Sequence, residues 1–513
     1  MERRVLIVVT IFAVLASLTS CAGIRGGGRA DPTTVATDKG VIQGLDGGNV
    51  IKFLGVPYAA APTGALRFAP PQPRATWEGV LSAKAPGPAC PQASQQGTED
   101  CLYLNLTVPK TDKANMPIYV WVHGGGFVQG EGASSDGTAI ATMANAIVVT
   151  MNYRMGILGY VANKGLEATP GDSGNYGLQD QQAALRWVKA NIANFGGDPN
   201  NVTLGGESGG AMSTCHHLVS PASTGLFARG ILESGPCAFD WGTMEQKYAV
   251  QADIPGKLGC TGTPAEIATC LRSPMLKARD VIAVQETLPR GVLMPSVGGV
   301  DVPVQGRNGI GKVPMLVGGN KWETGFYIPN TVNPSTQDAY ATLLRKIYGD
   351  TTGDKVAAAY PFSSYASGWE AVTTATSDFC PKNPVVGSFA VALCNDVRTY
   401  QLALAAGGAP VYGFIFADPN APPRGPVHTS ELQYLFLTST PLNPASKALS
   451  DTMIRYWSNF IISGNPNGKG LSNWPVYKTS FDVLLLAPND VHTFDADAAH
   501  KCSSFWQPLG NAL

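Results

Sequence analysis

The sequence predicts an α/β fold, with a central, mostly parallel twisted sheet and helices on both faces. Three observations lead to this class. Short apolar runs of strand length alternate with longer stretches of helical periodicity. One strand runs into Gly206-Glu207-Ser208-Gly209-Gly210, a pattern typical of a sharp strand–turn–helix connection. Another strand ends in the glycine-rich run His123-Gly124-Gly125-Gly126-Phe127.

The predicted elements follow the chain in order. Apolar–polar alternation over Val41–Leu54 predicts an antiparallel hairpin, and apolar spacing over Tyr176–Ile192 predicts a helix. Further strands are predicted at Leu102–Leu106, Pro117–Val122, Ala146–Met151, Val202–Leu204, Phe227–Glu233, Val313–Gly318 and Val411–Phe416. Gly235–Val302 and Pro329–Gly408 are expected to be helical insertions above the sheet. No linker-like composition follows Val35, so residues 36–513 are predicted to form a single domain.

Ser208 is the candidate nucleophile. The chain has 59 glycines, and at this glycine content about one sequence in two of this length would contain such a pentapeptide by chance. The prediction therefore depends on the residues before and after the pentapeptide. Val202–Leu204 supplies the strand before the turn, and Ala211–Val219 has no Gly or Pro to prevent a helix after it. The start of that helix would direct backbone N–H groups towards an oxyanion above the serine.

A serine becomes a nucleophile when a histidine takes its proton and an acid orients that histidine. With this type of turn, the acid and then the histidine follow the serine along the chain. His428, in a loop after the strand Val411–Phe416, is the candidate base. Glu323, just beyond the strand Val313–Gly318, is the candidate acid, although a solvated loop carboxylate explains its spacing equally well. The alternatives are His492 and His500 in the final polar tail, and Asp301 in an expected surface turn.

The glycine-rich run is the candidate oxyanion hole. Gly125 and Gly126 let the backbone double back with unobstructed N–H groups, which would act together with the N–H of Gly209. A phosphate-binding loop is the alternative. The run lacks the Lys-Ser/Thr ending of a P-loop and the spaced glycines of a dinucleotide site.

Composition and the N-terminus limit partners and location. A net charge of −1, with 14% charged residues, gives no electrostatic reason to expect nucleic acid. Arg3 and Arg4 precede an apolar run that is shorter than a membrane span of about 20 residues, so residues 1–20 are predicted to be a signal peptide. Leu18-Thr19-Ser20-Cys21 resembles a bacterial lipobox, which predicts a lipid on Cys21 and a flexible tether over residues 21–35. An ordinary signal peptide with an incidental cysteine is the alternative. The expected location is outside the cytoplasm, at the outer face of a bacterial membrane, through a lipid anchor rather than a transmembrane helix.

Ten cysteines favour an oxidising compartment. Three pairs close short loops and are predicted disulfides: Cys90–Cys101, Cys260–Cys270 and Cys380–Cys394. Cys215, Cys237 and Cys502 stay unassigned, and Cys215 is expected to be a buried thiol. No two cysteines are separated by only two residues, so metal binding by them is not expected.

With these residues in place, the chain resembles the type-B carboxylesterases, the family of carboxylesterases and cholinesterases. The resemblance covers nearly all of the chain after the signal peptide. It is carried by GVPYAAAPTGALRF, EDCLYLNL, HGGGF, MNYRMGILGY, NYGLQDQQAALRWVKANIANFGGDPNNVTLGGESGG, NKWETGF, GPVHTSELQYLF and YWSNFIISGNPN. It implies an α/β-hydrolase fold with helical insertions over the active site, a triad of Ser208, Glu323 and His428, and no metal or organic cofactor.

The resemblance also implies a polar network behind the triad, made of Glu207, Ser234 and Glu431. A buried cluster with only a structural role is the alternative. Two ion pairs, Arg67 with Glu99 and Arg154 with Asp180, are implied as structural.

Two departures from the family pattern concern the site. Gly209 stands where the family commonly has alanine, which leaves its N–H available. The loop between Cys90 and Cys101 contains no aromatic residue, whereas cholinesterases place a tryptophan there to bind a quaternary ammonium. Choline esters are therefore not expected as substrates.

Together these features predict a serine esterase that hydrolyses uncharged carboxylic esters through an acyl-enzyme intermediate. The alternatives are a lipase, a carbamate or amide hydrolase on the same site, and an esterase-like binding or adhesion module without turnover. Substrate choice depends on loop shape, which the fold alone does not fix.

Overall fold

The computed structural model describes residues 31–93, 97–238, 240–289, 291–380, 391–436 and 440–509. The predicted signal peptide, Cys21 and most of the predicted tether lie outside these residues. Thr33–Leu513 forms one compact unit. Its first strand, β1 (Thr34–Ala36), includes the last two residues of the predicted tether.

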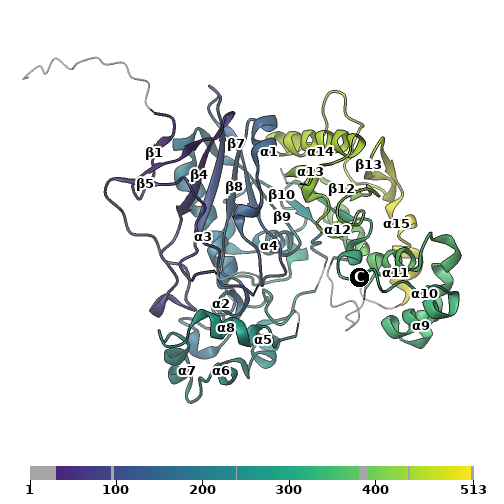
Figure 1. Cartoon of the computed structure of the whole chain (residues 1–513), viewed down its shortest axis with the longest axis horizontal. Helices are drawn as coiled ribbons and strands as arrows, with labels where there is room; N and C mark the ends of the chain where they lie inside the picture. The colour runs from purple at the N-terminus through teal and green to yellow at the C-terminus, as the bar shows by residue number, and fades with distance from the viewer. Residues whose placement is uncertain are drawn as a thin grey trace, which may run out of the picture. The chain divides into compact units, whose positions relative to one another are not determined.

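The described residues contain a central sheet with the strand order β14-β13-β12-β11-β10-β9-β7-β8-β6-β4-β3 (Figure 1). Neighbouring strands from β8 to β13 are parallel, whereas β6, β4 and β3 at one edge and β14 at the other run antiparallel to their neighbours. The strands are β3 (Leu45–Asp46), β4 (Val50–Pro57), β6 (Tyr103–Pro109), β7 (Met116–Val122), β8 (Ile147–Met151), β9 (Gly197–Glu207), β10 (Arg229–Glu233), β11 (Met315–Asn320), β12 (Val411–Phe416), β13 (Val483–Ala487) and β14 (Asp490–Phe494). A small second sheet joins β1 to β2 (Val41–Gln43) and β5 (Val80–Ser82). The predicted hairpin over Val41–Leu54 is therefore divided, because β2 pairs in the small sheet and only β3 pairs with β4.

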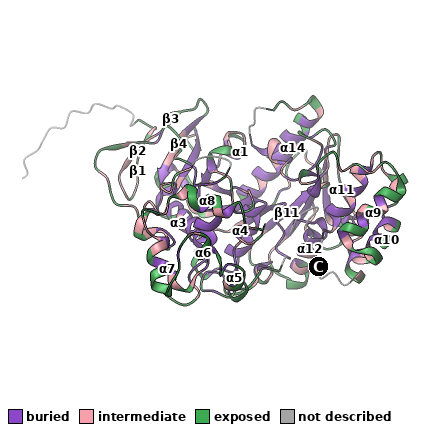
Figure 2. Cartoon of the chain, turned by 60° about the horizontal axis from the view of Figure 1, so that its bottom comes forward, coloured by how far each residue is buried: buried purple, intermediate pink, exposed green. Residues whose placement is uncertain are grey.

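Helices cover both faces of the central sheet, as the mostly parallel pattern predicts. Successive residues of β7 show the alternation: Ile118 and Val120 pack in the cluster that contains α3, whereas Tyr119 and Trp121 pack in the cluster that contains α1 and α14. Figure 2 shows the buried character of the central strands. The helices are α1 (Thr138–Ala144), α2 (Gly156–Tyr160), α3 (Tyr176–Asn191), α4 (Gly209–His217), α5 (Met244–Val250), α6 (Ile254–Lys257), α7 (Pro264–Leu271), α8 (Ala278–Gln285), α9 (Gln337–Tyr348), α10 (Asp350–Ala359), α11 (Gly368–Asp378), α12 (Leu393–Ala406), α13 (Leu432–Leu435), α14 (Pro444–Ser463) and α15 (Ala496–Ala499).

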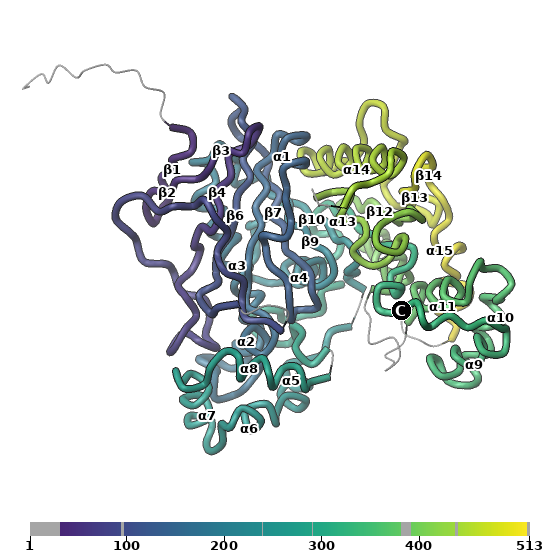
Figure 3. The backbone as a smooth tube through the Cα atoms, viewed as in Figure 1, coloured from purple at the N-terminus to yellow at the C-terminus, as the bar shows by residue number. Residues whose placement is uncertain are grey.

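Both predicted insertions are helical. Helices α5–α8 lie between residues 235 and 302, and α9–α12 lie between residues 329 and 408. Figure 3 shows α5–α8 grouped beside α2, and α9–α11 grouped at the other end of the sheet. Among the described helices, none combines the length and the apolar character that a membrane span requires.

The last part of the chain differs from the polar tail that its sequence suggested. The apolar run Val483–Leu486 adds a strand to the sheet, and β14 folds back on it. His492 is exposed on β14, where its Nδ1 lies 2.7 Å from Asp490 Oδ1. His500 is buried, with its Nδ1 2.6 Å from Asp378 Oδ1.

Four disulfides join described residues, and two of them confirm predicted pairs: Cys90–Cys101 and Cys260–Cys270. The predicted pair Cys380–Cys394 is wrong, because Cys394 bonds to Cys502, 108 residues away. Cys215 is not a thiol either. Helix α4 brings it beside the segment after β10, where it bonds to Cys237. Four disulfides are typical of proteins that fold outside the cytosol.

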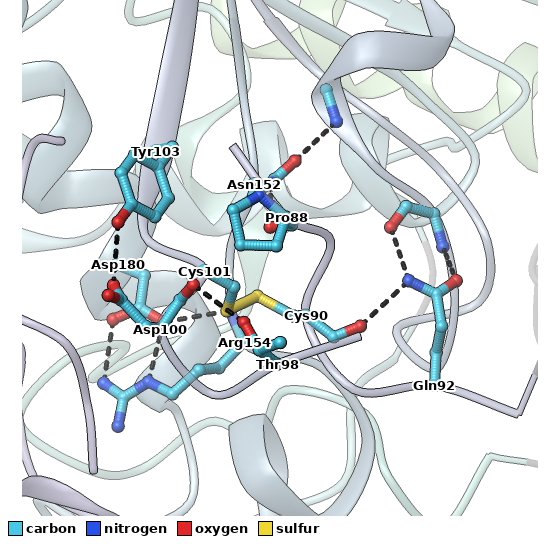
Figure 4. The surroundings of a disulfide bond; sticks show 12 residues. Pro88, Cys90, Gln92, Thr98, Asp100, Cys101, Tyr103, Asn152, Arg154 and Asp180 are labelled. Atoms are coloured by element: carbon cyan, nitrogen blue, oxygen red, sulfur yellow. Dashed lines mark hydrogen bonds and ion pairs between the residues drawn. A yellow bond between two sulfur atoms is a disulfide. The ribbon is translucent and has the colours of Figure 1, made fainter. Parts of the chain in front are cut away.

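The two implied ion pairs are present. Arg154 is 2.8 Å from Asp180, beside the Cys90–Cys101 disulfide (Figure 4). Arg67 is 2.5 Å from Glu99, and its guanidinium also donates to the backbone oxygens of Leu271, Ser273 and Leu276. Both arginines are almost completely buried, so the loss of either carboxylate would leave an unpaired buried charge.

Replacing both Cys394 and Cys502 by alanine is expected to lower the free energy of unfolding more than replacing both Cys260 and Cys270. The reason is that the longer loop gains more entropy in the unfolded chain. The chain-entropy relation gives about 5 kcal/mol for the long loop and about 3 kcal/mol for the short one. Urea denaturation of the two double variants measures the difference, and an equal or larger loss for the short loop would contradict the expectation.

Candidate active site

Ser208 occupies the turn between β9 and α4. Its φ of 52° and ψ of −119° lie in a region that residues with a side chain rarely adopt. The flanking glycines make the turn sterically feasible. A Cβ on Gly206 would lie 2.5 Å from the Val122 oxygen, and one on Gly210 would lie 1.9 Å from it. The structure therefore confirms the strand–turn–helix arrangement that the pentapeptide predicted.

The glycine-rich run after β7 lies directly against this turn. A Cβ on Gly124 would be 3.1 Å from Ser208 Cβ, and one on Gly209 would be 3.6 Å from Gly126 N. Gly125 and Gly126 have φ values of 105° and 61°. The N–H groups of Gly125, Gly126 and Gly209 donate to no protein acceptor within the described part of the chain. These donors are therefore available to an oxygen atom bound near Ser208.

His428 and Glu323 are brought together by the ends of two adjacent parallel strands, β12 and β11. His428 Nδ1 lies 2.5 Å from Glu323 Oε2, and both side chains are buried. A carboxylate accepts hydrogen bonds, so Nδ1 carries the proton. Glu323 is 0% exposed, so the alternative of a solvated loop carboxylate is wrong. Asp301, the other acid considered, instead accepts a hydrogen bond from Gln179 Nε2 at 2.8 Å.

The second imidazole nitrogen lies at the nucleophile turn. His428 Nε2 is 3.0 Å from Oε1 of Glu207, the residue before Ser208. This is a close approach rather than an aligned hydrogen bond, because Glu207 Oε1 accepts none from the described residues. Nε2 therefore stays available to a hydroxyl at the turn.

The charges around His428 set its protonation. Burial opposes the imidazolium, but the carboxylates of Glu207 and Glu323 outweigh burial and raise the pKa of His428 to about 9. Burial raises the pKa of Glu207 to about 7, against the attraction of His428. The two groups face each other, so they titrate as a pair.

Ser234 and Glu431 lie in one hydrogen-bonded cluster around Glu323. Glu323 Oε1 accepts from Ser234 Oγ and from the Asn320 backbone N–H, each at 2.6 Å. The Asn320 side chain donates to Ser234 Oγ at 3.0 Å and to Glu431 Oε2 at 2.5 Å. Sequence reasoning missed Asn320, although its place between a strand and Glu323 in NKWETGF was a usable signal. Glu207, the third residue of the expected network, contacts His428 instead.

Arg424 is a second residue that sequence reasoning missed. Its guanidinium donates to the backbone oxygens of Phe326 and Ile328 at 3.1 and 3.2 Å, and to Asn330 Oδ1 at 2.9 Å. Arg424 lies four residues before His428, so it ties the loop of the histidine to the loop that follows Glu323. No motif marks this arginine in the sequence.

Two histidines that precede Glu323 in the chain, His123 and His217, have other partners. His123 Nδ1 lies 2.8 Å from the Gly124 oxygen, and His217 is held between Gln181 and Ser223. Within the described ranges, no group of three or more His, Cys, Asp or Glu side chains is arranged to hold a metal ion.

Comparison with known proteins matches this arrangement to one family. The profile of the Carboxylesterase family matches residues 31–506. The para-nitrobenzyl esterase of Bacillus subtilis (strain 168) is 32% identical over 487 residues, which cover 89% of this chain and 95% of that protein. Liver carboxylesterase 1 of Oryctolagus cuniculus is 32% identical over 566 residues, which cover 96% of each chain.

Solved structures give the same result. A thermophilic PNB esterase superposes with a TM-score of 0.76 at 30% sequence identity, covering 92% of this chain and 99% of that one. A second PNB esterase structure superposes with a TM-score of 0.75 at 29% identity, covering 94% and 100%. The fold is therefore the α/β-hydrolase fold. The chain belongs to the carboxylesterase family and is a carboxylic ester hydrolase.

Proposed function

We propose that the chain hydrolyses uncharged carboxylic esters through an acyl-enzyme, with Ser208 as nucleophile, His428 as base and Glu323 as the acid that orients it. One observation carries the proposal. His428 Nδ1 contacts the buried carboxylate of Glu323, and His428 Nε2 lies beside Glu207, the residue before Ser208. Nucleophilic ester cleavage requires a proton acceptor beside the serine hydroxyl.

The first half of the reaction forms the acyl-enzyme. His428 Nε2 takes the hydroxyl proton as Ser208 Oγ attacks the ester carbonyl carbon, and the resulting oxyanion is bound by the N–H groups of Gly125, Gly126 and Gly209. Each such donor typically lowers the barrier by on the order of 3 kcal/mol. The bond to the alcohol oxygen then breaks, and Nε2 returns its proton to the leaving alcohol.

The second half repeats the sequence with water. Nε2 takes a proton from water as its oxygen attacks the acyl carbon, and the proton then passes to Ser208 Oγ as the acid leaves. In both halves Glu323 stabilises the transient imidazolium. The Ser234–Asn320–Glu431 cluster fixes the position of that carboxylate, since a buried charge needs donors on each oxygen.

We also propose that the mature chain is exported and held at a bacterial membrane by a lipid on Cys21. The support is the lipobox-like Leu18–Cys21 and the four disulfides.

Cys21→Ala is expected to release the esterase from the membrane fraction into the soluble fraction. Unchanged membrane association of this variant would refute the anchor.

Ser208→Ala is expected to lower kcat by at least about 10⁴-fold, because the nucleophile is removed while the oxyanion donors remain. A fluorophosphonate should label the unchanged protein on the peptide that contains residue 208, and should not label the variant. Ser213→Ala, a change of another buried serine on α4, is the matched control and should keep labelling. Labelling at a different residue would refute the proposed nucleophile.

Glu207→Gln is expected to move the acid limb of the kcat/KM–pH profile to lower pH. Activity requires neutral imidazole, so kcat/KM rises as His428 loses its proton, at a pKa held above 6.5 by two carboxylates. Removing the negative charge that faces Nε2 disfavours the imidazolium and lowers that pKa. Initial rates with a nitrophenyl ester between pH 5 and 10 measure the shift, and an unmoved limb would show that Glu207 does not act on His428 through its charge.

A further inference from the structure

A disulfide joins the helix of the nucleophile to the segment that supports the acid. Cys215 lies on α4, about two helical turns after Ser208, and it bonds to Cys237, which follows Ser234 closely in the chain. Both cysteines and Ser234 are 0% exposed. Because the Ser234 hydroxyl donates to Glu323, the disulfide connects the surroundings of Ser208 with those of the acid.

Ser234 has a backbone conformation that its neighbours must hold. Its φ is 51°, in the left-handed region that residues with a side chain rarely adopt. Such a residue keeps this conformation only where surrounding contacts determine it. From this position Ser234 Oγ donates to Glu323 Oε1 at 2.6 Å, and the Ser234 N–H donates to the Gly318 oxygen at 2.7 Å. The direction of the hydroxyl therefore depends on what fixes the chain on each side of Ser234.

The central sheet fixes the chain before Ser234. Glu233, the last residue of β10, pairs with Glu207 of β9 and with Gly318 of β11. The backbone oxygen of Glu233 also accepts from the Ser208 N–H at 2.8 Å. Strand pairing therefore holds this side of Ser234.

The chain after Ser234 has no comparable backbone contacts. Residues 235–237 form no backbone–backbone hydrogen bond with the part of the chain that the structure describes. Gly235 lies against the first turn of α4, where a Cβ on it would be 2.5 Å from a side chain of that helix. Cys237 then bonds to Cys215 on the same helix. The disulfide is therefore the covalent link that keeps this side of Ser234 against α4.

We propose that the Cys215–Cys237 disulfide positions the acid of the triad. It holds Ser234 in the conformation from which the hydroxyl donates to Glu323, and it thereby keeps that carboxylate directed at His428 Nδ1. The inference rests on the proposed roles of Glu323 and His428. It goes beyond them, because it assigns an effect on the rate to a bond that acts only through Ser234.

The test replaces both Cys215 and Cys237 by alanine and measures the hydrolysis of nitrophenyl butyrate. The kcat is expected to fall about tenfold, the factor that corresponds to one hydrogen bond to a charged group. KM should change by less than about twofold, because the lost hydrogen bond orients the acid and does not contact the ester. Ser234→Ala should reproduce both effects.

A double-mutant cycle separates positioning from stabilisation. In a Ser234→Ala background, removal of the disulfide should lower kcat no further, because the hydrogen bond to Glu323 is already absent. A second tenfold loss in that background would overturn the inference. An unchanged kcat after removal of the disulfide alone would overturn it as well.

Replacing both Cys260 and Cys270 by alanine is the matched control. This change removes a disulfide between the segment after α6 and helix α7. It should lower the urea midpoint of unfolding but keep kcat and KM. An equal loss of kcat in the control would show that the Cys215–Cys237 bond has no specific effect on the site.

Partial reduction of the unchanged protein by dithiothreitol gives a second measurement, which needs no variant to fold. Activity is measured first, and the thiols are then alkylated and mapped by peptide. The loss of kcat should follow the reduction of Cys215 and Cys237. A loss that follows the other disulfides, or full activity after this bond is reduced, would overturn the inference. Failure of the proposed function is separate, because it would appear as undiminished hydrolysis by Ser208→Ala.

Discussion

The site depends on a buried ion pair between an imidazole and a carboxylate. Removing Glu323 from water costs several kcal/mol unless its charge and its lone pairs are compensated. Nδ1 of His428 compensates one oxygen, and Ser234 with the Asn320 N–H compensates the other. These partners come from the ends of β10, β11 and β12, which are paired in parallel register. The sheet register is therefore what allows the carboxylate to be buried.

Two other carboxyl groups, those of Glu233 and Glu431, are buried near Glu207, and their environments differ from that of Glu323. Burial raises the pKa of Glu233 to about 8, and it also raises the pKa of Glu431 well above its ordinary value. Glu233 accepts from Trp457 Nε1 on one oxygen, while its other oxygen has no partner among the described residues. Burial therefore disfavours the charged form of these two carboxyls. By contrast, both oxygens of Glu323 accept hydrogen bonds.

The sequence predicted the parts of the site whose requirements are local. The turn at Ser208 follows from glycines that no other residue could replace without collision, and the strand before it and the helix after it are read from adjacent residues. The choice of the acid was less local. The strand before Glu323 favoured it over Asp301, but its spacing fitted a solvated loop carboxylate equally well. The pairing of β11 with β12, or a family resemblance, is needed to bring Glu323 to His428. Asn320 and Arg424 act through loop contacts that leave no pattern in the chain.

The wrong disulfide has a related physical reason. Short spacing favoured Cys380 as the partner of Cys394, yet doubling a loop adds only about 0.6 kcal/mol to the cost of closing it. The fold therefore determines which cysteines pair, and it places Cys502 beside Cys394. The last hairpin was missed for a similar reason, because β14 is partly polar and becomes a strand only through its pairing with β13.

The Cys394–Cys502 bond makes residues 394–502 a covalent ring. That ring contains β12, His428, Glu431, α14, β13 and β14, whereas Ser208 and Glu323 lie outside it. A protease that nicks one exposed loop between these cysteines leaves two fragments joined through sulfur. When the nick lies between Cys394 and His428, the fragment with the histidine stays attached to the rest of the sheet through the disulfide, and reduction is needed before it can diffuse away.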